Sequence, residues 1–113
     1  LRAAANTVAG SLRSARSLAI ARSDACYVYA VDAPDPDEVL LYLAPFEKPE
    51  AVERLPEGVS FVGSLPDPGD VWFLPDGSCS TSLVLRVKGE GREEYRITVS
   101  AASGRVSVRK VKQ

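Results

Sequence analysis

The chain has 113 residues, of which 45% are hydrophobic and 26% are charged, and its formal net charge is −1. These values are typical of one globular domain with its own core, and they give no overall attraction to nucleic acid or membranes. Histidine is absent, which excludes a Ser-His-Asp triad, a Cys-His nucleophile and a histidine-ligated metal. Two cysteines are too few for a four-thiolate zinc site. We therefore predict a protein that is not an enzyme and needs no cofactor.

The first predicted element is an amphipathic helix. Apolar residues recur at alternating steps of four and three, which is the spacing of one helical face. The residues on this face are Leu1, Ala5, Val8, Leu12, Ala15 and Ala19. We expect them to pack the helix on a sheet. The repeat is already running at the first residue, with no N-cap residue before it, so we also expect the helix to continue upstream in a longer protein.

After the helix, the pattern changes to short β-branched and aromatic runs separated by turn residues. Strands are expected at 26–31, 38–44, 59–64, 71–74, 81–88, 94–100 and 104–111, and one helical turn at 51–55. The predicted fold class is α+β, with one helix laid on an antiparallel β-sandwich or meander of six or seven strands. A single domain is expected, with the helix over 1–25 and a β-rich head over 26–113.

The two cysteines, Cys26 and Cys79, allow two interpretations. In an oxidising compartment they are candidates for a disulfide that ties the end of the helix to a later strand. Otherwise they are two buried thiols, a common fate of cysteine.

An acidic cluster lies in the segment DAPDPDE, and a weaker one in LPDPGD. The carboxylates of Asp32, Asp35, Asp37 and Glu38 are suitable calcium ligands. However, Asp-Pro pairs are ordinary turn formers, and prolines stiffen a loop that calcium needs to be flexible. We therefore interpret both clusters as turns, and predict no metal site.

The C-terminal segment is locally basic, because no acidic residue follows Glu94. Its candidate DNA contacts are Arg105, Arg109, Lys110 and Lys112. Four cations support only weak, salt-sensitive binding without sequence preference. An edge strand that uses charge to avoid pairing with other strands explains them better.

The order of these features resembles the soluble domain of the GspH/FimT family of minor pseudopilins and minor type IV pilins. In that family a helix of the form L-R-x-A-R-x-x-A-I leads into a β-sandwich, whose later strands carry a hydrophobic-x-F-x-P-x-G turn and a Thr/Ser-Gly-Arg-Val element. The matching residues are Leu12, Arg13, Ala15, Arg16, Ala19, Ile20, Phe73, Pro75, Asp76, Gly77, Ser103, Gly104, Arg105 and Val106.

The resemblance implies a structural subunit at or near the tip of a type II secretion pseudopilus, where minor subunits prime assembly. It also implies a leader cut by a prepilin peptidase, N-terminal methylation and an apolar segment spanning the inner membrane. The head then lies in the periplasm, which favours a Cys26–Cys79 disulfide. The implied partners are other minor and major pseudopilins or pilins. We expect the isolated domain to be a monomer, because the strongest oligomerising surface in the family is the apolar helix.

The alternative within the family is a minor type IV pilin that acts in pilus assembly or DNA uptake. Some members are associated with DNA through a basic Gly-Arg-x-Arg stretch. Here Gly104, Arg105 and Val106 are followed by Ser107, and the next arginine is Arg109, on the same strand face. This departure weakens the prediction of DNA binding without removing it.

Overall fold

The computed structural model describes residues 1–31, 37–43, 48–63, 65–67, 69–89, 91 and 93–111. In this part of the chain one helix, α1 (Arg2–Arg22), is followed by eight strands. They are β1 (Cys26–Val31), β2 (Glu38–Tyr42), β3 (Ala51–Arg54), β4 (Ser60–Val62), β5 (Trp72–Phe73), β6 (Leu83–Lys88), β7 (Glu94–Val99) and β8 (Val106–Lys110).

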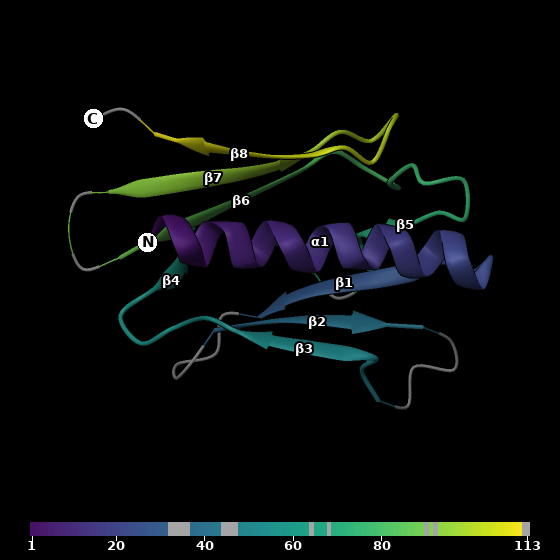
Figure 1. Cartoon of the computed structure of the whole chain (residues 1–113), viewed down its shortest axis with the longest axis horizontal. Coiled ribbons are helices and arrows are strands. Elements are labelled where there is room, and N and C mark those ends of the chain that lie inside the picture. Colours follow the sequence, from purple (N-terminus) through teal and green to yellow (C-terminus); the bar gives the residue numbers. More distant parts are fainter. Residues whose placement is uncertain are drawn as a thin grey trace.

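The strands form two antiparallel sheets (Figure 1). Sheet A has the order β3-β2-β1-β5, and sheet B has the order β4-β6-β7-β8. Each sheet is thus a meander of three consecutive strands plus one strand from the middle of the chain. The chain crosses between the sheets at these two strands: β4 pairs with β6 in sheet B, and the next strand, β5, pairs with β1 in sheet A.

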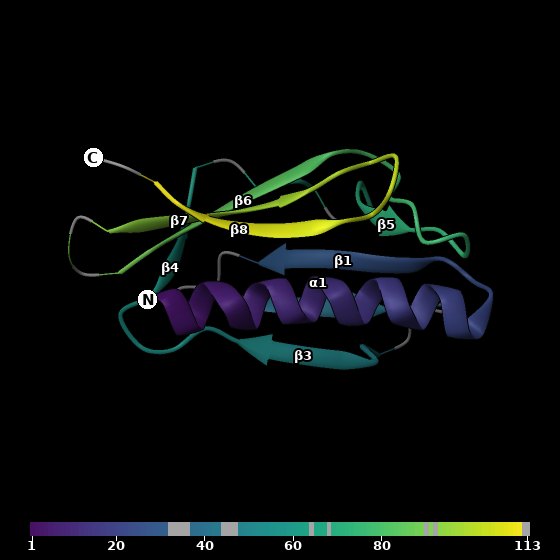
Figure 2. The same cartoon turned by 45° about the horizontal axis from the view of Figure 1, so that its top comes forward.

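Helix α1 runs along the long axis of the molecule, with β3 on one side of it and β8 on the other (Figures 1 and 2). It contacts β1, β2, β3 and β5 of sheet A and β7 and β8 of sheet B. Its 21 residues span about 30 Å, most of the 41 Å length of the molecule. The helix therefore packs against both sheets at once.

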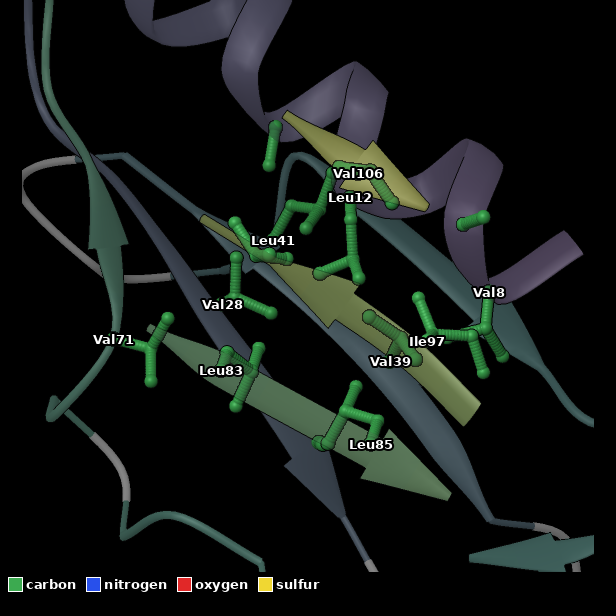
Figure 3. Packing of buried hydrophobic residues seen from close by; sticks show 14 of the residues in the cluster. Val8, Leu12, Val28, Val39, Leu41, Val71, Leu83, Leu85, Ile97 and Val106 are labelled. Atoms are coloured by element: carbon green, nitrogen blue, oxygen red, sulfur yellow. The ribbon is translucent and has the colours of Figure 1, made fainter. Parts of the chain in front are cut away.

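The core lies between the two sheets and the helix (Figure 3). Alternate residues of the longer strands point inward, as the two-residue period of a strand requires. Val28 and Leu41 come from sheet A, Leu85 and Ile97 come from sheet B, and all four are buried. Leu12 of α1 is fully buried beside them. The α+β fold class predicted from the sequence is confirmed.

The helix ends earlier than the sequence predicted, at Arg22 instead of residue 25. Ser23 adopts a left-handed conformation, with φ 51° and ψ 40°. This places the next amide, that of Asp24, 3.2 Å from the carbonyl oxygen of Ala19. Such a cap satisfies the last carbonyl groups of the helix and turns the chain directly into β1.

Two further details of the prediction are wrong. Residues 51–55 were expected to form a helical turn, but β3 covers Ala51–Arg54 and pairs with β2. The described residues also contain eight strands, one more than the largest number expected. The additional strand is β3 itself, a short exposed segment that its neighbour β2 holds in a strand, and pairing of this kind overrides weak local propensity.

Candidate functional site: the junction of the helix with two glycine turns

The apolar face of α1 lies where its spacing predicted. Ala5, Val8, Leu12, Ala15 and Ala19 are fully buried, and Leu1 is partly buried against the same core. Ala4 and Ala9 are buried as well. With five of the seven buried helix residues being alanine, the sheets approach the helix axis closely. The head is therefore fixed on the helix by continuous packing.

Two arginines beside this face add directional contacts. The Nη2 of Arg13 donates a hydrogen bond to the carbonyl oxygen of Val106 at 3.2 Å. One turn later, the Nε of Arg16 donates to the carbonyl oxygen of Gly77 at 2.9 Å. Hydrogen bonds from a charged donor are roughly twice as strong as those between neutral groups. The helix is thus bonded to β8 and to the turn after β5, although these segments are far apart in the sequence.

The carbonyl that Arg16 contacts belongs to a tight turn. Gly77 is buried with φ 91°, a conformation that favours glycine. Asp76 Oδ1 accepts hydrogen bonds from the hydroxyl of Ser78 at 2.6 Å and from its amide at 2.9 Å. These bonds lower the pKa of Asp76, and they stabilise the turn with its carboxylate ionised.

A second glycine turn, between β7 and β8, meets the first. Gly104 is buried with φ 69°, and its amide donates to the carbonyl oxygen of Ser100 at 2.7 Å. A Cβ built on Gly104 overlaps the carbonyl oxygen of Gly77 and lies 3.1 Å from the Nε of Arg16. The two turns and the arginine therefore touch at one point, which we call the junction (Arg16, Gly77 and Gly104).

The junction brings together one residue from each of the three sequence motifs on which the family resemblance depends. The helix motif contributes Arg16, the Phe-x-Pro-x-Gly turn contributes Gly77, and the Ser-Gly-Arg-Val element contributes Gly104. The sequence did not predict this contact. The only local signal was a pair of arginines, Arg13 and Arg16, spaced by one helical turn at the border of the apolar face.

The predicted basic residues do not form a single patch. Arg109 is exposed on the outer face of sheet B, opposite Arg96 of β7 in the strand register, and Arg105 is exposed just before β8. Lys110 alternates to the other face, beside the N-terminal part of α1, and its Nζ lies 3.4 Å from Glu93. Lys112 lies outside the described residues. The charges are thus divided between two surfaces.

The two cysteines are free and buried, so the predicted disulfide is not formed in this structure. Phe73 pairs with Cys26 on one side and with Cys79 on the other. Because the strand of Phe73 lies between them, the Cα atoms of the two cysteines are two strand spacings apart, or about 9–10 Å. A disulfide needs Cα atoms within about 7 Å. Burial raises the pKa of the Cys26 thiol to about 11, with a smaller contribution from Glu50. It raises the pKa of Cys79 as well.

The described acidic residues of the first cluster have structural partners. Asp37 is buried, and its Oδ2 accepts a hydrogen bond from the amide of Phe61 at 2.8 Å, which links β2 to β4. Glu38 pairs with Arg54 at 3.1 Å across β2 and β3. Asp32 and Asp35 lie outside the described residues. In the segments that the structure describes, no three His, Cys, Asp or Glu side chains gather closely enough to hold a metal ion.

Among the described residues, no helix combines the length and the apolarity that a membrane-spanning segment requires.

The comparisons with known proteins agree with the geometry. The chain matches the family model of the type II transport protein GspH over residues 4–104. No curated protein matches it. The type IV minor pilin FimU of Pseudomonas aeruginosa PAO1 has a similar structure, with a TM-score of 0.73, 17% identity, and coverage of 96% of this chain and 92% of that one.

The minor pseudopilin EpsH, from the type 2 secretion system of Vibrio cholerae, is also similar. Its TM-score is 0.65 at 18% identity, over 97% of this chain and 94% of that one. At such identities the two structures establish the fold, and the family model establishes the relationship. Because that model covers residues 4–104, most of the chain, the chain belongs to the GspH family.

Proposed function

We propose that this chain is the head and the adjoining helix of a minor pseudopilin in a type II secretion system. In this role the protein assembles and does not catalyse. Membership of the GspH family and likeness in fold to EpsH and FimU support a pilin-like role. In the full-length protein, an apolar N-terminal segment anchors the subunit in the inner membrane, and the head faces the periplasm.

The junction is the observation that carries this proposal. A fibre subunit must move as one body, because a force on its helix has to reach its head. Hydrogen bonds from Arg13 and Arg16 join the helix to β8 and to the turn after β5. Together with the buried helix face, they prevent the helix from rotating or sliding on the sheets.

Deletion of the full-length gene in its own organism tests the role. We expect loss of secreted proteins from the medium, with restoration by the wild-type gene and retention of surface pili. Loss of pili with normal secretion would instead assign the protein to the type IV pilus. A strain in which neither changes would contradict both.

The second candidate is a minor type IV pilin that contacts DNA during uptake. Arg105 and Arg109 favour it, because both are exposed and neither makes an ion pair within the described residues. A titration of duplex DNA at low and moderate salt, with the native chain and with Arg105→Ala/Arg109→Ala, decides it. Equal binding by the two proteins would exclude these arginines from a DNA site.

A further inference from the structure

The last strand of sheet B has a free edge. Among the described strands, β8 pairs only with β7. In an antiparallel pair, the N–H and C=O groups of successive residues point to opposite sides of the strand. The amide of Val111, which follows β8, bonds to the carbonyl oxygen of Glu94 on β7 at 2.9 Å. The main-chain groups of Lys110 and Val108 therefore face away from β7.

Arg13 covers one end of this edge. From the helix, its Nη2 donates to the outward carbonyl oxygen of Val106 at 3.2 Å. Within the part of the chain that the structure describes, no hydrogen bond reaches the outward main-chain groups of Val108 or Lys110. These two residues thus present the donors and acceptors to which an incoming strand bonds.

The other sheet edges differ from β8. At β4 the amide of Phe61 donates to Asp37, and at β5 the amide of Ser80 donates to the carbonyl oxygen of Trp72, so both edges are bonded to other parts of the chain. Strand β3 is a free edge, but the charges in it and just before it cancel: Lys48, Glu50, Glu53 and Arg54. Only β8 is therefore both free and charged with one sign among the described edges.

A groove of about 400 Å³ lies between β8 and the N-terminal part of α1. Tyr95 and Val108 contribute apolar surface to it, and Arg2, Arg13 and Lys110 supply its charges. In both views β8 runs along the helix (Figures 1 and 2). A strand added to β8 would therefore lie in this groove, beside the helix.

The charges around β8 are almost all positive. Arg109 is exposed on the outer face of sheet B opposite Arg96, and Lys110 is on the inner face beside the arginines of the helix. α1 contains no acidic residue, and none follows Glu94, which is held by a different arginine. Glu93 lies 3.4 Å from the Nζ of Lys110, but both side chains are more than half exposed, so this pair is weak. A strand beside β8 meets cations on both of its faces.

We propose that an extended acidic segment of a different protein adds to β8 as a further strand. Its main chain bonds to Val108 and Lys110, and its carboxylates pair with the cations on the two faces. A second copy of this chain cannot supply its own β8, because two such edges would place arginine and lysine side chains against like charges. The contact therefore adds one partner and does not propagate.

Nuclear magnetic resonance of the 113-residue chain with a synthetic peptide tests this proposal. The probe is a short capped peptide of alternating glutamate and valine, in about 0.01 M salt. We expect the amides of Val108 and Lys110 to exchange with solvent about tenfold more slowly when the free peptide is at about ten times its Kd. The amides of Ser107 and Arg109 already face β7 and should change little. Salt at about 1 M should abolish the binding.

Two control peptides separate main-chain pairing from charge. Lysine in place of glutamate reverses the charge of the strand, and methylation of every amide nitrogen keeps the charge but removes all main-chain donors. Neither peptide should slow exchange at Val108 or Lys110. Equal binding by the methylated peptide, or binding of the acidic peptide without slower exchange at these two amides, would overturn the proposal. Absence of binding at low salt would overturn it as well.

A matched pair of variants locates the site. Arg109→Glu/Lys110→Glu reverses two charges of β8, whereas Lys48→Glu/Arg54→Glu reverses two charges at the β3 edge with the same change in net charge. We expect the first to weaken peptide binding by at least about tenfold and the second to leave it within about twofold. Circular dichroism and thermal unfolding check that both variants fold. Equal weakening in the two would mean that only net charge matters, and the proposal would fail.

A nucleic acid is the competing occupant of this edge, and duplex DNA is its probe. DNA offers phosphates but no main-chain strand. If duplex DNA binds the native chain and the acidic peptide does not, the edge is a nucleic-acid surface and the proposal is wrong. The inference goes beyond the proposed function and does not depend on it, because the gene deletion described above tests the fibre role separately. Unchanged secretion on deletion would reject that role and leave the strand site standing.

Discussion

Helix α1 is held differently on its two sides. On the side of β8 and the glycine turns, two guanidinium groups donate to backbone carbonyls, and two buried glycines touch. On the side of β3, the described residues of the helix make no hydrogen bond to the strand, and a hollow of about 300 Å³ remains between the two elements. Hydrogen bonds have direction and apolar contacts do not. The first side therefore fixes the rotation of the helix, while the buried face supplies most of its stability.

The largest effect is expected from a cavity in the face that both sides share. Leu12 is fully buried among residues of both sheets, and Leu12→Ala should lower the free energy of unfolding by about 2–5 kcal/mol. Urea denaturation measures it. Ile20→Ala is the matched control, because Ile20 is on the same helix and is 44% exposed. An equal loss in the two variants would contradict the assignment of the packing face.

Substitutions at two glycines, one on each side of the helix, allow the two sides to be compared directly. Gly104→Ala places a Cβ against the carbonyl oxygen of Gly77 at φ 69°, so we expect a loss of about 2–3 kcal/mol from strain and a shifted turn. Gly10→Ala, on the β3 side, meets no atom within 4 Å and should raise helix stability by about 0.5–1 kcal/mol. Thermal unfolding of both variants measures the contrast. Changes of the same sign would remove the distinction between a closed and an open side.

The hydrogen bond at the junction contributes less to the free energy of unfolding. Arg16→Met keeps most of the aliphatic stem but removes the donor to the Gly77 carbonyl, 2.9 Å away. Leaving that part-buried carbonyl without its partner should cost about 1–2 kcal/mol. Arg22→Met, at the exposed end of the helix, is the control and should have a smaller effect. Chemical denaturation measures the free energy of unfolding of the two variants. If Arg16→Met is as stable as the native chain, packing alone fixes the helix.

The smallest effect concerns sheet B away from the helix. Arg86 donates two hydrogen bonds of 2.9 Å to Glu94, and this pairing lowers the pKa of Glu94 below its ordinary value of 4.5. A lowered pKa in the folded state adds stability above the unfolded pKa, and that stability is lost as the pH falls through the folded pKa. We therefore expect Glu94→Gln to be less stable than the native chain at pH 7 and nearly equal to it in strong acid.

Unfolding free energies measured between pH 7 and pH 2 test this dependence. Glu93→Gln is the control, because its pairing with Lys110 is exposed and longer, at 3.4 Å. A Glu94→Gln variant whose deficit stays constant with pH would disprove the electrostatic origin.

Several elements could be predicted from the sequence because their signals are local. The buried face of α1 follows a period of about 3.6 residues, and the inward residues of β6, such as Leu85, follow a period of two. β3 could not be predicted in this way. Its four residues have no clear alternation, and they become a strand only because β2 offers a partner edge. The Cys26–Cys79 disulfide was predicted from compartment alone, and Phe73 lies between the two residues.

The sequence by itself determined that α1 has one apolar face, that a β-rich head follows, and that three motifs occur in the order of the GspH family. Only the tertiary structure decided that Arg16, Gly77 and Gly104 meet, since 61 residues separate the first two. It also decided that β3 and β8, the free edges of the two sheets, lie on opposite sides of the helix. Periodicity and composition are properties of neighbouring residues, whereas a contact between distant segments depends on how both sheets fold around the helix.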